Sequence, residues 1–194
     1  MGLKYSKIDS IADLGTLGLG AGILCTGFTP NTGTVTGKFG VTTGGITFNA
    51  NPTYDDWGAD VDQAPNNTKE LKRLKQLEPT LSGTFLSTSD EIIQLLMGGG
   101  AKDGTSGAFT PPAPMSDYAS TNGLAFTNDL WWVGDTSNNN GFIAIHMKNA
   151  LNQSGFQLSA TKDNKAQYSF EFHAHYSLAD TDDAPFEIYF GNPA

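Results

Sequence analysis

The chain has 194 residues, which is long enough for one substantial hydrophobic core, and its 23 glycines and 9 prolines predict many turns. Its 20 acidic residues outnumber 11 basic ones, and the formal net charge of −9 disfavours direct binding to nucleic acid or anionic lipid. A single cysteine, Cys25, excludes an internal disulfide framework, and the lack of a signal-peptide pattern predicts a cytosolic protein with no membrane span.

The first residues predict an arm followed by strands. Residues 1–18 show no periodicity and are expected to form an N-terminal arm in front of a single β domain at 19–194. Strands are predicted at 19–28 and 33–48, and the second of them alternates apolar with polar residues on both sides of a Gly-Gly pair.

A long loop is predicted at 49–68. Its composition is that of turns, yet it is too long for an idle connector in a compact domain. Because disordered linkers rarely carry a tryptophan, we expect this loop to contact a neighbouring subunit, with its two aromatic residues as apolar anchors. The loop residues assigned to this inter-subunit contact are Tyr54, Asp55, Asp56, Trp57, Asp60 and Asp62.

A basic block follows the acidic loop at once and consists of Lys69, Lys72, Arg73 and Lys75. Neighbouring blocks of opposite charge suit self-association between chains. The same residues can instead pair within one chain, where exposed ion pairs contribute only about 0–1 kcal/mol each. A calcium ion among the aspartates is a weaker alternative, because the central glycine and distal glutamate of an EF-hand loop are absent.

A strand at 73–86 and a short helix at 89–97 are predicted next. The leucine spacing before Pro79 also fits one helix face, but the proline and the run that follows it favour an edge or bulged strand. Thr88 and Glu91 form a capping box for the helix. The helix is expected to lie between adjacent subunits or to cover the sandwich, and its packing residues are Ile92, Ile93, Leu95 and Leu96.

The second half of the chain predicts another long loop and a series of strands. Residues 98–122 are rich in proline, glycine and serine and are expected to form the loop. The clearest strand signal is at 166–178, where apolar and polar residues alternate. Further strands are predicted at 129–134, 141–149, 155–161 and 185–190. The expected fold is mainly β, a sandwich or barrel whose sheets are wet on one side, with one short helix packed on them.

The histidines of the long predicted strand are the best metal candidate. His173 and His175 are two residues apart on one strand face, and Glu171 or His146 could supply a third ligand. The simpler interpretation is that they are polar surface residues, and we predict neither a metal nor a cofactor. The patterns G-x-S-x-G, P-loop and dinucleotide-binding loop are also absent, so the chain is predicted not to be an enzyme.

Two neighbouring tryptophans raise the possibility of a sugar-binding surface. Trp131 and Trp132 lie in a predicted strand, where adjacent side chains point to opposite faces, so at most one of them can line a sugar platform. Acidic β-sandwiches can also be glycoside hydrolases, but nothing in the spacing singles out two paired carboxylates here.

The succession of features resembles a known family. A strand pair is followed by the loop ITFNANPTYDDWGADVDQAPNN, by a strand containing LEPTLSGTF and by the short helix TSDEIIQLLMG. A proline-rich loop comes next, and the chain closes on YSFEFHAHYS and DDAPFEIYF. Over residues 33–190 this order is similar to that of the major tail proteins, or tail tube proteins, of long-tailed bacteriophages.

The resemblance implies a β-sandwich whose copies form rings, typically hexameric, that stack into the hollow tail tube through which DNA is ejected. It implies tape-measure, tail-terminator and distal tail proteins as further partners, and a location in the virion tail after assembly in the cytoplasm of a host bacterium. DNA would pass through the lumen without specific binding. The extra immunoglobulin-like domain of some relatives is not expected. A tube protein of a contractile tail-like particle and a carbohydrate-binding β-sandwich module are the alternatives.

Overall fold

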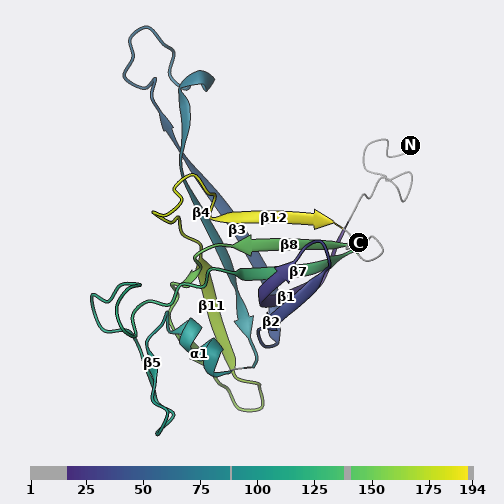
Figure 1. Ribbon diagram of the computed structural model, residues 1–194. Coiled ribbons are helices and arrows are strands. Elements are labelled where there is room, and N and C mark those ends of the chain that lie inside the picture. The colour runs from purple at the N-terminus through teal and green to yellow at the C-terminus, as the bar shows by residue number, and fades with distance from the viewer. Residues whose placement is uncertain (1–16, 88, 138–140, 192–194) are drawn as a thin grey trace, which may run out of the picture.

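The computed structural model describes residues 17–87, 89–137 and 141–191, which form two five-stranded antiparallel sheets and, among these residues, one α-helix (Figure 1). In spatial order, sheet A consists of β12 (Phe186–Gly191), β8 (Phe142–Met147), β7 (Leu130–Thr136), β1 (Gly18–Thr29) and β2 (Thr34–Lys38). Sheet B consists of β10 (Gln157–Ser159), β11 (Gln167–His173), β4 (Lys72–Phe85) and β3 (Thr42–Asp56), and β9 (Leu151–Asn152) also pairs with β11. The predicted mainly β architecture is confirmed, and neither large sheet closes on itself.

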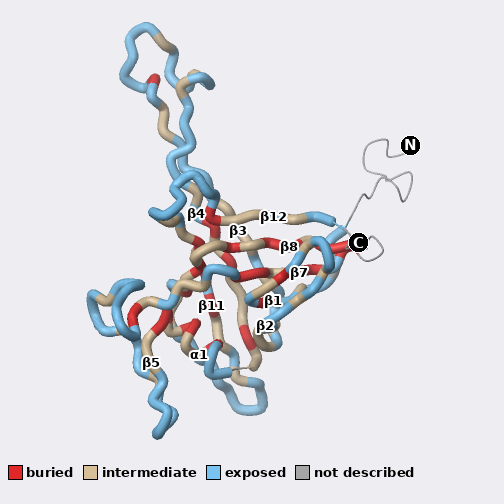
Figure 2. The backbone as a smooth tube through the Cα atoms, viewed as in Figure 1, coloured by how far each residue is buried: buried red, intermediate tan, exposed pale blue. Residues whose placement is uncertain are grey.

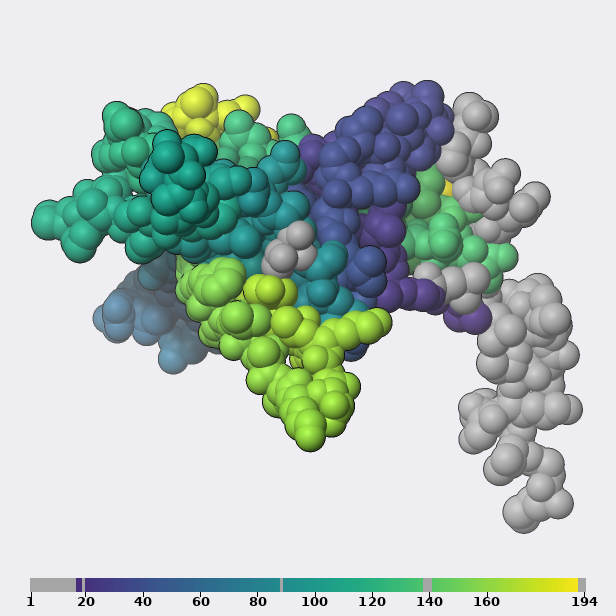
Figure 3. Space-filling model, turned by 90° about the horizontal axis from the view of Figure 1, so that it is seen from below, coloured from purple at the N-terminus to yellow at the C-terminus, as the bar shows by residue number. Residues whose placement is uncertain are grey.

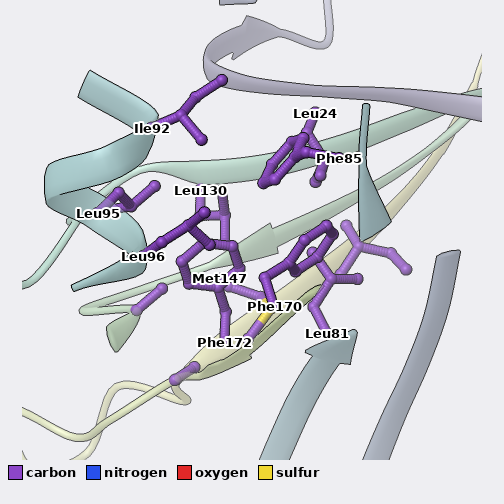
Figure 4. Packing of buried hydrophobic residues seen from close by; sticks show 13 residues of the cluster. Leu24, Leu81, Phe85, Ile92, Leu95, Leu96, Leu130, Met147, Phe170 and Phe172 are labelled. Atoms are coloured by element: carbon purple, nitrogen blue, oxygen red, sulfur yellow. The ribbon is translucent and has the colours of Figure 1, made fainter. Parts of the chain in front are cut away.

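The main core lies between the two sheets, whose strands cross steeply in Figure 1. Sheet A contributes Leu24 and Met147, sheet B contributes Phe85 and Phe172, and the helix contributes Leu96 (Figure 4). Each of these five side chains is at most 2% exposed, and burying one such side chain contributes about 1.5–3 kcal/mol. The core is therefore built jointly by both sheets and the helix.

The helix α1 (Asp90–Leu96) covers one end of this core. The Ser89 side chain caps it by accepting a hydrogen bond from the Ile92 backbone N–H at 3.3 Å, while Thr88 of the predicted capping box lies outside the described residues. Ile92, Leu95 and Leu96 are buried in the main core and Ile93 is half-buried. The helix therefore covers the sandwich, which is one of the two placements expected for it. Because Ile92, Leu95 and Leu96 are buried in the main core, these side chains are not available to a neighbouring subunit.

The strand β11 is shorter than predicted, because it ends at His173 and not at residue 178. His173 pairs with Thr80 of β4, and the next residue of that strand is Pro79, which has no N–H to give to the ladder. Ala174 donates a last hydrogen bond to the carbonyl oxygen of Pro79 at 3.1 Å, and the following residue donates to that of Lys148, just beyond β8. The chain thus leaves sheet B at Pro79, and β4 becomes an edge strand there.

Sheet A is buried on both faces at its centre, which corrects the expectation of sheets wet on one side. Its second apolar cluster contains Cys25, Phe28, Trp131, Phe142 and Ala144, on the face opposite Leu24 and the main core. The Phe28 ring makes edge contacts with the rings of Trp131 and Phe142, with centroid separations of 5.6 Å and 5.0 Å. Burial raises the pKa of the Cys25 thiol, as suits a small core residue.

Other boundaries were partly predictable. The run predicted at 33–48 is divided between β2 and β3, which belong to different sheets, and the strand predicted at 155–161 shrinks to β10. The other short strands agree with prediction to within two residues. The loop predicted at 98–122 contains a small ladder of β5 (Ala101–Lys102) and β6 (Phe109–Thr110). Most of the expected N-terminal arm lies outside the described residues. Within the described ranges, no helix combines the length and apolar character needed to cross a bilayer.

Candidate functional site

The strands β3 and β4 continue past the end of sheet B as a projecting hairpin, residues 50–79. β11 pairs with β4 only between Thr80 and Phe85, whereas β3 pairs with β4 as far as Asp56 and Lys72. The hairpin stands away from both sheets in Figure 1, and Figure 2 shows it exposed along nearly its whole length. The prediction of a loop at 49–68 is therefore wrong for 49–56, because a ribbon without a core partner tolerates turn-forming residues.

The carboxylate of Asp56 closes the tip of the projecting hairpin. One of its oxygens accepts the Gly58 N–H at 3.1 Å and the other accepts the Asn67 N–H at 2.8 Å. These two hydrogen bonds, first that from Gly58 and then that from Asn67, lower the pKa of Asp56 below its usual value. The Trp57 N–H also donates to the Leu71 carbonyl oxygen at 3.1 Å. The tip is thus a hydrogen-bonded loop with defined geometry.

The charges of the basic block are largely matched inside the hairpin. Its ion pairs are Lys72–Asp56 at 3.6 Å, Lys75–Asp55 at 3.4 Å and Lys69–Glu70 at 3.6 Å. The Arg73 guanidinium lies over the Trp57 ring, 5.2 Å from its centroid. Asp55 and Asp56 therefore pair with lysines of their own chain, which is the second of the two arrangements considered for the acidic loop and the basic block. Asp60 and Asp62, at the tip, form no ion pair with any residue in the described ranges.

Apolar side chains are exposed along this polar hairpin. Tyr54 lies directly opposite Leu74 in the ladder, so the two share one face, and they are 57% and 53% exposed. Trp57 and Val61 at the tip are 65% and 43% exposed. A two-stranded ribbon in water is at best marginally stable, and clustered exposed apolar groups mark interaction surfaces. The projecting hairpin is therefore the strongest candidate for a contact with another molecule.

Two sheet edges carry further exposed apolar side chains, which the sequence analysis missed. β12 ends sheet A and presents Ile188 and Phe190 on one face, 47% and 71% exposed. β10 ends sheet B and presents Leu158, next to Phe156, with exposed fractions of 53% and 44%. The alternation in PFEIYF indicated the first pair, but nothing in the sequence indicated that both strands would lie at an edge. Neither edge has a further strand beside it in the described part of the chain.

Charged side chains hold β12 against β8. The Lys148 ammonium donates to Asp183 at 2.7 Å and to Glu187 at 2.8 Å. The hydrogen bond from Lys148, and then that from the Tyr189 hydroxyl, lower the pKa of Glu187. The edge at β12 is thus a fixed strand with one apolar face.

The histidines do not converge on one point. His173 contacts the Glu171 carboxylate at 2.9 Å, whereas His175 contacts the Asn149 carbonyl oxygen at 3.0 Å and the Gln153 side chain at 3.1 Å. Because β11 ends at His173, the alternation that placed both rings on one face does not continue to His175. Among the described residues no three His, Cys, Asp or Glu side chains are arranged to hold a metal ion.

Neither neighbouring tryptophan presents an open platform. Trp131 is 6% exposed and stacks on the His146 ring at a centroid distance of 4.1 Å, and Nε2 of His146 lies 2.9 Å from Oδ1 of Asp129. Trp132 packs against the main core and donates its indole N–H to the Ala21 carbonyl oxygen at 2.9 Å. Both indole rings therefore make contacts within the chain, and neither presents an open face on which a sugar ring could stack.

The chain matches no protein-family model and no curated protein.

Proposed function

We propose that the chain is a structural protein that assembles with copies of itself into stacked rings, typically hexameric, which form the tail tube of a long-tailed bacteriophage. The observation that carries this proposal is the projecting hairpin, which displays Tyr54, Leu74 and Trp57 on a ribbon with no support from its own core. The order of sequence features that resembles the tail tube family supports the same conclusion.

Burial against a second copy would stabilise this hairpin. Fully burying a large apolar side chain from water contributes about 1.5–3 kcal/mol, and the exposed parts of Tyr54, Leu74 and Trp57 would each supply a share of that on docking. The hydrogen bonds from the Gly58 and Asn67 N–H groups to the Asp56 carboxylate already order the tip, which lowers the conformational entropy lost on docking. The hairpin is thus suited to insertion into a neighbour.

The open edges at β12 and β10 support lateral and axial growth. An edge strand with exposed backbone groups and apolar side chains is a template for pairing with another chain. Contacts between different surfaces of identical copies give rings where the rotation closes and filaments where it does not. One chain with several such surfaces can therefore build rings and also stack them.

The acidic balance suits a conduit for DNA. A net charge of −9 on each chain gives about −54 for a ring of six copies, which disfavours adhesion of nucleic acid. Tape-measure, tail-terminator and distal tail proteins are the proposed partners, and the virion tail is the proposed location.

The tube of a contractile tail-like particle would use the same surfaces. A sugar-binding module is less well supported, because Trp131 and Trp132 are both engaged within the fold.

Size measurement and negative-stain electron microscopy of the purified full chain test this proposal. We expect mass to rise with concentration in light scattering after size exclusion, together with rings and hollow tubes on the grid. A particle that stays monomeric at the highest attainable concentration, with neither rings nor tubes, would overturn it.

A further inference from the structure

Among the described residues, two basic side chains that form no ion pair lie together in one turn. Nine of the chain's basic residues lie in the described ranges, and five of them form ion pairs with carboxylates. Arg73 stacks on Trp57. Lys38, Lys162 and Lys165 form no ion pair with any residue that the structure describes. Two of these three lie in the turn between β10 and β11, residues 160–166, and both are exposed.

This turn and the tip of the projecting hairpin lie at opposite ends of sheet B. Tyr168 of β11 pairs with Phe85, so the turn lies beyond the end of β4 that is buried in the core. The tip lies beyond the other end of β4, past Lys72. Figure 1 shows the hairpin at the top and the turn at the bottom, and Figure 3, viewed from below, shows the β10–β11 hairpin standing out from the body.

The two ends carry opposite charge beside exposed apolar side chains. The tip, residues 57–68, has a charge of −2 from Asp60 and Asp62, and the turn has +1, because Asp163 lies between Lys162 and Lys165. Tyr54 and Leu74 adjoin the tip, and Phe156 and Leu158 adjoin the turn, all of them between 44% and 57% exposed. The outer side of β10 has no further strand among the described residues.

We propose that the projecting hairpin of one copy docks against the β10–β11 hairpin of the next copy along the stack. Asp60 and Asp62 then lie near Lys162 and Lys165. This inference rests on the proposed self-assembly and names the two surfaces and the chemistry that join successive rings.

The contact is head-to-tail, and it therefore propagates. Each copy uses its tip toward one neighbour and its turn toward another, and because these surfaces lie at opposite ends of sheet B the contact repeats along a line. A two-fold contact between two tips would instead bring Asp60 and Asp62 of both copies together, and like charges placed side by side oppose association.

Charge reversal at both ends tests this pairing. The variants are Asp60→Lys with Asp62→Lys, and Lys162→Glu with Lys165→Glu, in the full chain. We expect each double variant to keep the wild-type melting curve and to stack about tenfold less than wild type in light scattering and electron microscopy. Mixed in equal amounts, the two variants should stack again, because the reversed tip of one is then complementary to the reversed turn of the other.

A matched control is Asp180→Lys with Asp182→Lys, which makes the same change of charge at exposed positions outside both surfaces. We expect this variant to stack like wild type. If wild type stacks and both test variants stack equally well, or if their mixture does not recover stacking, the inference is overturned while the proposed function stands. If wild type forms neither rings nor tubes, the proposed function itself fails.

Discussion

The guanidinium carbon of Arg73 lies 5.2 Å from the centroid of the Trp57 ring. Arg73 is adjacent to Leu74 in β4, so its side chain lies on the face opposite Tyr54 and Leu74, and the Trp57 ring that it covers lies on that same side. The hairpin therefore offers an aromatic group on each side, and a partner that covers either face meets an apolar contact.

Trp57 should report assembly by fluorescence. It is 65% exposed, whereas Trp131 is 6% exposed and Trp132 packs against the main core, so a soluble quencher such as acrylamide should act mainly on Trp57 in single subunits. We expect the quenching constant to fall several-fold on assembly, because the hairpin becomes covered. The variant Trp57→Phe should show low quenching in both states. Quenching that is unchanged between subunits and tubes would show that this indole stays in water.

Replacing the apolar face of the hairpin should separate assembly from folding. In the double variant Tyr54→Ser with Leu74→Ser, we expect wild-type melting temperature and loss of rings and tubes, since buried interface anchors contribute about 2 kcal/mol or more each. Thr53→Ala with Gln76→Ala, a cross-strand pair next to them in the ladder, is the matched control and should assemble. Tubes of normal length from the serine variant would remove the assigned role of this face.

Acid should loosen the tip of the hairpin before it unfolds the protein. The folded-state pKa of Asp56 lies below the ordinary 3.8, so its hydrogen bonds to Gly58 and Asn67 stabilise the tip at neutral pH. That stabilisation is lost as pH falls through the folded-state pKa. We expect hydrogen exchange at the Gly58 and Asn67 amides, corrected for intrinsic rates, to accelerate below about pH 4. In Asp56→Asn, exchange should be fast at every pH, and a retained pH dependence would point to another group.

Truncation on two sides of the helix should give unequal losses of stability. Leu96 is fully buried in the main core, and Leu96→Ala should lower the free energy of unfolding by about 2–5 kcal/mol. Ile93 is only half-buried, so Ile93→Ala should cost clearly less. Urea unfolding followed by circular dichroism measures both. Equal losses would indicate that the helix docks by a different face.

The buried amide of Asn152 should be costly to remove. Its nitrogen donates to the carbonyl oxygens of Leu96, at 2.6 Å, and Gly155, at 3.0 Å, and its oxygen accepts the Glu171 N–H at 2.9 Å. Asn152→Ala leaves these groups without partners, and we expect a loss of about 1–3 kcal/mol in urea unfolding. The exposed Ser159→Ala should change stability little. A neutral effect of Asn152→Ala would mean that water replaces the amide.

The sequence predicts best where a strand packs on the core. Phe170 and Phe172 of β11 alternate with polar residues because one face is buried, and that period is visible in the chain. The end of the same strand was not predictable from its own residues, since Pro79, which stops the ladder, belongs to a strand far away in sequence.

The projecting hairpin shows the opposite case. Residues 50–56 are strand, yet both faces meet water, so no apolar period develops and the composition reads as a turn. The opposite charges of Asp55, Asp56 and the basic block were recognised, but their pairing across the ladder depends on a register that composition does not contain. The exposed edges at β10 and β12 depend in the same way on strand order.

One continuous strand, β4, runs from Lys72 in the projecting hairpin to Phe85 in the main core. Its hydrogen bonds to β11 lie across the strand direction, so a pull on the tip loads all of them together in shear. The hairpin is therefore anchored in the interior, and tension between connected copies would be carried into the main core.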